Sequence, residues 1–211
     1  MDYTCSSCAK NCCGSGETDN LPKNCPCLEI EEQAKIKHEY EDPQNLMIAR
    51  NAAIVEAEGY CRWTRLRETM EFAKRCGYQK LGIALCLGLQ REGKVLSGIL
   101  RDNGFQVVSI VCKNGSTPKE FLGITEEEKV RPGNYEPMCN PIAQAMLLNQ
   151  SKTDFNLVLG LCVGHDSLFI KYSDAPVTVF AVKDRVLAHN PLGAIYLAES
   201  YYKSSNQMES F

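Results

Sequence analysis

The chain has 211 residues, of which 44% are apolar and 23% are charged, a composition typical of a globular protein with a hydrophobic core. Its net charge of -3, from 23 basic and 26 acidic residues, argues against partners such as nucleic acid or an anionic membrane. No apolar run approaches the roughly 20 residues that span a bilayer, and the N-terminus lacks the pattern of a signal peptide. We therefore expect a cytoplasmic protein.

Cysteine is strongly over-represented, with 12 residues. Disulfide frameworks are rare in a reducing cytosol, so this many thiols predicts metal sites, catalysis or redox chemistry instead. Exposed thiols and clusters oxidise readily, which fits an anaerobic or strictly reducing host. Six cysteines lie within the first 28 residues, and the other six are spread between residues 61 and 162. The two groups call for separate explanations.

Residues 1–28 form a cysteine-rich module with almost no large apolar side chains, so a hydrophobic core cannot hold it together. Bound metal is the usual substitute for a core in such a segment, and the alternative is a disordered tail with free thiols. The two-residue gap between Cys5 and Cys8 is found in zinc knuckles and ferredoxin loops. Thiolates suit both zinc and iron, and the surplus of two cysteines favours iron–sulfur or a redox-active pair. The candidate metal ligands are Cys5, Cys8, Cys12, Cys13, Cys25 and Cys27.

The rest of the chain predicts an α/β domain. Residues 29–42 are strongly charged and indicate a solvated helix or linker, and the domain follows over residues 43–211. Hydrophobic periodicity predicts helices over 43–58, 64–76, 90–103, 141–149, 165–172 and 191–202, and buried strands over 80–86, 105–112, 155–162 and 176–182. Continuous apolar strands separated by helices predict an open, mostly parallel, doubly wound sheet of the Rossmann or flavodoxin type.

Three of the four predicted strands end on a cysteine, namely Cys86, Cys112 and Cys162. Parallel strands end along one edge of the sheet, and ligands of open α/β sheets bind outside that edge where the strand order reverses. Cys139 precedes a helix that leads into the third strand, and the long loop over 113–138 would let it reach the other three. Four such thiolates would hold a [4Fe–4S] cluster or one zinc ion.

Polar residues follow the same strand ends. His165 is a candidate general acid or base, and Asp166 would orient it or cap the following helix. Lys183 follows the fourth strand and would hold an anionic substrate. Asn140 and Gln144 lie close in sequence to the fourth cysteine and are candidates for hydrogen bonds to a bound cofactor. These five residues complete the predicted site.

Each of these features also has a plain structural interpretation. Free cysteines often fill a core as small apolar residues, which we favour for Cys61 and Cys76 because neither has a partner at metal-ligand spacing. In the same structural interpretation, Lys183 and Arg185 are ordinary charged residues of a loop. The sequence contains no dinucleotide-binding glycine motif, no P-loop and no nucleophile elbow, which argues against those enzyme classes.

Three stretches of the chain carry a family resemblance: LGIALCLGLQREGKVLSGILRDNGFQVVSIVCKNG, MCNPIAQAMLLN and FNLVLGLCVGHDSLFIKYSDAPVTVFAVKDRVLAHNP. The chain resembles an uncharacterised prokaryotic family, a domain of unknown function described as cysteine-rich and metal-binding. The resemblance covers nearly the whole chain and implies metal at the N-terminal cysteines, including Cys5, Cys8, Cys12 and Cys25. It implies no particular reaction.

Together these features predict an iron–sulfur protein, a redox or cluster-dependent enzyme of the oxidoreductase or lyase type that acts on a small molecule at the sheet edge. The predicted cofactor is a [4Fe–4S] cluster, with zinc as the alternative. The expected partner is a small-molecule substrate or a redox protein, and a homodimer is the default assembly. The competing hypotheses are a zinc-binding metal-handling or sensor protein without catalysis, and a ligand-binding domain with structural zinc only.

Overall fold

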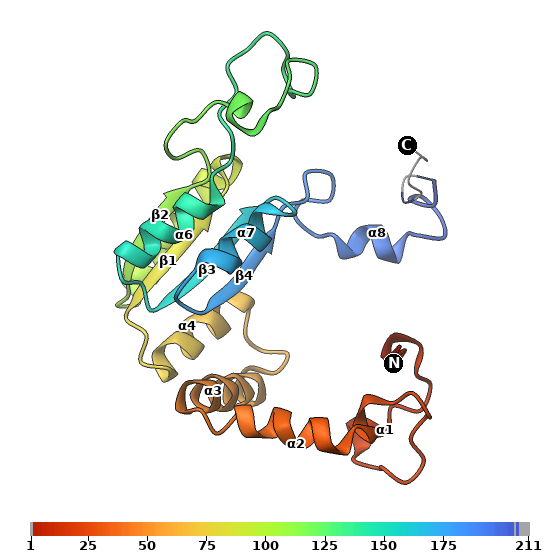
Figure 1. Cartoon of the computed structure of the whole chain (residues 1–211). Coiled ribbons are helices and arrows are strands. Elements are labelled where there is room, and N and C mark those ends of the chain that lie inside the picture. The colour runs from red at the N-terminus through yellow and green to blue at the C-terminus, as the bar shows by residue number, and fades with distance from the viewer. Residues whose placement is uncertain (1, 205, 207–211) are drawn as a thin grey trace. The chain divides into compact units, whose positions relative to one another are not determined.

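The structure is a computed structural model that describes residues 2–204 and 206 (Figure 1). It divides into two compact units, Met1–Tyr60 and Cys61–Phe211, which we describe separately. Within the described part of the chain, every helix is too short or too polar to cross a membrane.

The first unit combines short helical turns with two longer helices. One-turn 3₁₀ helices span Cys5–Ser7 and Pro26–Leu28, and the α-helices are α1 (Cys12–Ser15), α2 (Ile30–Glu39) and α3 (Pro43–Gly59). None of residues 2–28 is buried, as expected for a segment without a hydrophobic core. No residue of α2 is buried either, so the charged segment is a solvated helix. Asp42 caps α3 by accepting the N–H groups of Gln44 and Asn45, both at 2.9 Å.

The second unit contains a four-stranded parallel sheet, which confirms the predicted fold class. Its strands are β1 (Lys80–Leu85), β2 (Gln106–Val111), β3 (Phe155–Leu161) and β4 (Val177–Val182). All neighbours pair in parallel, in the order β2-β1-β3-β4. The chain therefore moves outward from β1 in one direction and then returns to continue in the other, which places the switch point between β1 and β3.

Helices cover both faces of this sheet, as Figure 1 shows for α6 and α7 on one face. The helices of the unit are α4 (Arg65–Arg75), α5 (Gln90–Asp102), α6 (Pro141–Gln150), α7 (His165–Tyr172) and α8 (Leu192–Tyr196). One buried cluster joins residues of α4 and α5 to alternate positions of β1, such as Leu81 and Ile83. The other joins α6 and α7, through Leu148 and Phe169, to Ala84 on the opposite face.

Two boundaries differ from the sequence prediction. The strands that were expected to end on cysteines end one residue earlier, so Cys86, Cys112 and Cys162 are the first residues beyond the sheet. The prediction of a closing helix over 191–202 is wrong in length, because α8 covers only Leu192–Tyr196. No residue of α8 is buried, so the segment lacks the tertiary packing that a short helix needs to persist.

Candidate metal and thiol sites

All six cysteines of the N-terminal segment line one hollow of about 260 Å³ within the first unit. Cys5 begins the turn Cys5–Ser7 and Cys8 follows it directly, while α1 supplies Cys12 and Cys13. Cys25 directly precedes the turn Pro26–Leu28, which contains Cys27. The rest of the lining comes mainly from small or polar side chains and from Leu21, Pro22 and Pro26. All 12 cysteines of the chain are free thiols, and these six are exposed or half-buried. The segment therefore gathers six metal-ligating atoms in one place.

The thiols of the hollow influence one another. The backbone N–H groups of Asn11 and Lys10 donate to the sulfur of Cys8 and lower the pKa of that thiol. The pKa of the Cys27 thiol is raised, chiefly by its hydrogen bond with Cys25. The charges of Cys25, Cys13 and Cys5 also raise the pKa of Cys27. A cation in the hollow would relieve this repulsion between thiolates, because metal binding stabilises the deprotonated ligand.

The hollow fits a thiolate-bound metal in its donor set. Among residues 2–204 and 206, no group of three or more Cys, His, Asp or Glu side chains is arranged as a ready-made metal shell. The six cysteines would therefore have to close around a metal as it binds, which is how small metal-binding modules couple binding to folding. The N–H groups already directed at Cys8 are of the kind that stabilise cluster sulfur atoms.

A second group of cysteines lies at the edge of the sheet. Cys86 and Cys112 occupy neighbouring positions because Leu85 and Val111 are register partners, and the Cys112 N–H donates to the Leu85 carbonyl at 2.8 Å. Cys139 is brought to the same place by the N–H of the next residue, which donates to the Cys112 carbonyl at 2.8 Å. The Cys112 thiol, 3% exposed, hydrogen-bonds to both other thiols. We call Cys86, Cys112 and Cys139 the thiol row.

Cations and N–H groups surround the two outer members of the thiol row. The pKa of Cys86 is lowered to about 5 by its hydrogen bond with Cys112, by the N–H of Gly88 and by Lys183. The pKa of Cys139 is lowered to about 3 by its hydrogen bonds with Cys112 and His165. The pKa of Cys112 is raised, because its neighbours hold it as the donor between two thiolates and because it is buried. The surroundings of the row therefore favour the thiolate form of Cys86 and Cys139 and the protonated form of Cys112.

Cys162 lies beside the thiol row and is paired with Arg185. The guanidinium Nη2 of Arg185 donates to the sulfur of Cys162 at 3.2 Å, and its charge also acts on Cys86 and Cys139. The prediction that the four cysteines ligate a metal stays a prediction. The structure shows that the Cys112 thiol lies between those of Cys86 and Cys139. Cys162 shares the cation Arg185 with Cys86 and Cys139.

The other predicted site residues take up different roles. His165 and Lys183 contact the two ends of the thiol row. The carboxylate of Asp166 accepts the N–H of Ser167 at 2.8 Å and acts on the imidazole only through its charge. The Asn140 side chain caps α6 by accepting the N–H of Ala143 at 3.1 Å. The structure thus gathers the thiols and cations, while Asp166 and Asn140 bond to their own helices.

Gln144 is fully buried and links two strands at the site. Its Nε2 donates to the carbonyl oxygens of Leu85 at 3.2 Å and Ile110 at 2.6 Å, just before the cysteines that follow β1 and β2. Its Oε1 has no hydrogen-bond partner among the described residues. The side chain therefore positions the strand ends beneath the thiol row.

Gly160 allows the side chain of Leu89 to pack closely against β3. It has a φ of +67° and lies where the pairing of β3 with β4 shifts register. A Cβ at this position would lie 2.2 Å from Leu89 Cδ1 and 3.7 Å from Lys183 Nζ. A side chain here would displace Leu89, whereas Lys183 lies at an ordinary contact distance, so the glycine is needed for the backbone conformation and for the close packing of Leu89.

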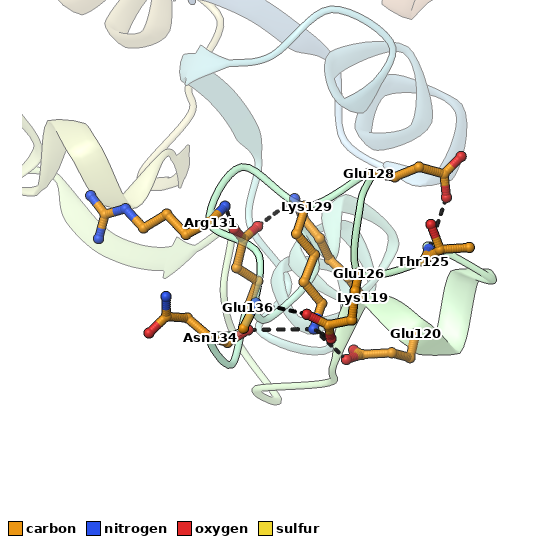
Figure 2. Close-up of polar contacts among 10 residues, drawn as sticks. Lys119, Glu120, Thr125, Glu126, Glu128, Lys129, Arg131, Asn134 and Glu136 are labelled. Carbon is orange, nitrogen blue, oxygen red and sulfur yellow. Dashed lines mark hydrogen bonds and ion pairs between the residues drawn. The ribbon is translucent and has the colours of Figure 1, made fainter.

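The segment over 113–138 is internally bonded (Figure 2). The buried ammonium of Lys129 pairs with Glu120 at 2.6 Å and with Glu126, and Lys119 pairs with Glu136 at 2.6 Å. These contacts hold together the loop that leads to Cys139, which was expected to reach the site through its length alone.

Lys113 is a site residue that the sequence reasoning missed. Its Nζ donates to the Pro137 carbonyl at 2.5 Å, and its charge lowers the pKa of Cys139. Its position directly after the strand-end Cys112 was the available signal, since Lys183 follows β4 in the same way. The site is thus more cationic than was predicted.

The pairing of Cys139 with His165 predicts a specific pH dependence. The Cys139 pKa is lowered and the His165 pKa is raised, so the ion pair persists from about pH 3 up to the raised pKa of the imidazole. It is lost below that range when the thiolate is protonated and above it when the imidazole is neutral. We expect iodoacetamide to alkylate Cys139 at pH 5 in the folded protein, measured on its tryptic peptide by mass spectrometry.

The matched control is the same peptide in guanidinium chloride, where reactivity should follow an ordinary thiol pKa of about 8.5. His165→Gln should move the folded-state profile toward higher pH. Identical profiles for the folded and the unfolded chain would contradict the assignment.

Comparison with known proteins places the chain in a family. Residues 25–180 match the family described as "Protein of unknown function (DUF1847)", a range that includes the whole thiol row. An uncharacterised protein of Methanocaldococcus jannaschii is 46% identical over 192 residues, which are 91% of this chain and 93% of that protein. No solved structure matches the chain. The resemblance noted in the sequence is confirmed, and the chain belongs to the DUF1847 family.

Proposed function

We propose that this chain is a cysteine-thiolate metalloprotein that binds an iron–sulfur cluster through its N-terminal cysteines. The observation that carries the proposal is that all six cysteines of residues 2–28 line a single hollow. No residue of that segment is buried, so ligation of a metal is the remaining source of cohesion. The family to which the chain belongs has no known function, so the metal that the sequence resemblance implies at these residues is part of the proposal.

The chemistry of the hollow supports a cluster. Four thiolates hold a [4Fe–4S] cluster, and N–H groups directed at the sulfurs tune its potential. Cys8 already accepts two such N–H groups. A bound cluster supplies one-electron transfer. Zinc uses the same thiolate donors, so a zinc-binding metal-handling or sensor protein is the alternative proposal.

The second unit supports a redox enzyme with a small-molecule substrate. Its thiol row lies where β1 ends next to the switch point, the usual place for ligands in this fold class. Lys183, His165 and Arg185 surround the row and favour an anionic substrate.

The test is metal and sulfide analysis of the full chain purified without oxygen. We expect brown protein with about four iron and four acid-labile sulfide per cluster bound, together with an EPR signal after reduction by dithionite. One zinc per chain without sulfide would contradict the iron–sulfur cluster and support the metal-handling alternative. Protein that binds neither metal during anaerobic reconstitution would overturn both.

A further inference from the structure

The thiol row has the geometry of a disulfide-forming site. Adjacent strands lie about 4.8 Å apart, so Cys86 and Cys112, which directly follow register partners, fall within the Cα separation of about 4.4–6.8 Å that a disulfide needs. Cys112 belongs to a buried cluster against which Cys86 packs. Cys139 packs against the same cluster. Cys112 can therefore pair with Cys86 without movement of the sheet, and Cys139 is the third thiol at the same cluster.

Accessibility divides the row into two kinds of thiol. Cys86 and Cys139 are half-buried, whereas Cys112 is 3% exposed. A substrate can reach the outer sulfurs but not the central one. This arrangement matches an attacking thiol backed by a resolving thiol, because the second step of disulfide exchange needs a second sulfur close to the first, and the buried Cys112 is out of reach of the substrate.

We propose that the thiol row is a dithiol–disulfide redox centre that reduces small anionic disulfides. The sulfur of Cys86 attacks a substrate RS–SR, so that a Cys86–SR bond forms, the RS–SR bond breaks, and the first RS⁻ leaves and takes a proton from solvent. Cys112 then attacks the Cys86 sulfur and gives its proton to the second leaving thiolate. Two electrons pass from the two cysteines to the substrate, and a dithiol reductant resets the centre.

Cys139 extends the centre. It packs against the cluster that contains Cys112, and the N–H of the next residue bonds to the Cys112 carbonyl, so the Cys139 thiolate can displace Cys86 from the new disulfide and free that residue for a second attack. The choice of an anionic disulfide follows from the four cations around the row, which are Lys113, His165, Lys183 and Arg185. The proposal rests on the second unit alone and goes beyond the N-terminal cluster, because it requires no metal.

The experiment treats the full chain, without oxygen, with oxidised glutathione, then alkylates the remaining thiols and maps the tryptic peptides. The three cysteines fall on separate peptides, residues 81–91, 102–113 and 130–152, so each disulfide can be assigned. We expect the wild type to form a Cys86–Cys112 or Cys112–Cys139 disulfide. Cys112→Ser should stop at a glutathione adduct on Cys86 or Cys139. Cystamine, a cationic disulfide, should react about tenfold more slowly.

Cys76→Ser is the matched control, because Cys76 is also a buried cysteine of the second unit, at 8% exposure, and lies outside the thiol row. It should behave as the wild type. The disulfides found in the tryptic peptides of the wild type test the proposal even where a variant does not fold. Stable glutathione adducts without an internal disulfide would overturn the redox centre, as would thiols blocked by stoichiometric metal at these peptides. Equal rates with glutathione disulfide and cystamine would overturn the anionic specificity. None of these outcomes depends on metal in the N-terminal hollow.

Discussion

Replacement of Cys8 with serine is expected to remove most of the metal from the N-terminal hollow and to unfold the segment around it. The Cys8 sulfur accepts two backbone N–H groups and lines the hollow with five other cysteines. A serine hydroxyl stays protonated and is a poor ligand for soft metals. Thiolate-bound zinc supplies about 10–16 kcal/mol to small modules near neutral pH, and no buried apolar residue can replace that contribution here. Metal per chain and visible absorbance measure the loss.

The control for this prediction is Cys61→Ser, which changes an exposed thiol of the second unit. It should keep the full metal content. The second unit should remain folded in both variants, because its two hydrophobic clusters contain only residues from position 66 onward. Full metal content in Cys8→Ser would show that Cys8 is not a ligand, and a parallel Cys13→Ser variant would identify one of the two surplus thiols by its smaller effect.

The sheet was predictable because its central strands β1 and β3 are continuous apolar runs in the amino-acid sequence. All seven residues of β3 are buried, and five of the six in β1, so their burial on both faces is visible without knowledge of the neighbours. The parallel direction followed from the helices between the strands. The closing helix over 191–202 could not be judged in this way, since its persistence depends on packing that the structure does not provide.

The grouping of the cysteines was only partly predictable. Their place at one sheet edge followed from the strand ends, but which thiols touch depends on strand order and on a long-range bond between the Asn140 N–H and the Cys112 carbonyl. Gln144 illustrates the limit. Its closeness to Cys139 in sequence suggested a cofactor contact, whereas the turn of α6 directs its amide to the ends of β1 and β2.

Replacement of Gln144 with glutamate should destabilise the second unit more than any neutral substitution at this position. Gln144→Met keeps the volume but removes two hydrogen bonds to Leu85 and Ile110, a loss of about 1–3 kcal/mol. Leu85 keeps its bond from the Cys112 N–H, which places the expected loss in the lower part of that range. Gln144→Glu would set a carboxylate against the same two carbonyl oxygens in a fully buried position, where an unpaired charge costs about 3–5 kcal/mol.

The charge itself makes this prediction dependent on pH. Burial raises the pKa of the new carboxyl above its ordinary value of about 4.3. The neutral acid can donate one hydrogen bond, so the variant should recover stability below about pH 4.3 and lose it as the pH rises through the raised pKa. Urea unfolding at acidic and neutral pH measures this change, with Gln150→Glu at an exposed position of α6 as the control. A deficit that does not vary with pH would mean that the carboxyl reaches solvent, and wild-type stability of Gln144→Met would mean that the two hydrogen bonds do not hold the strand ends beneath the thiol row.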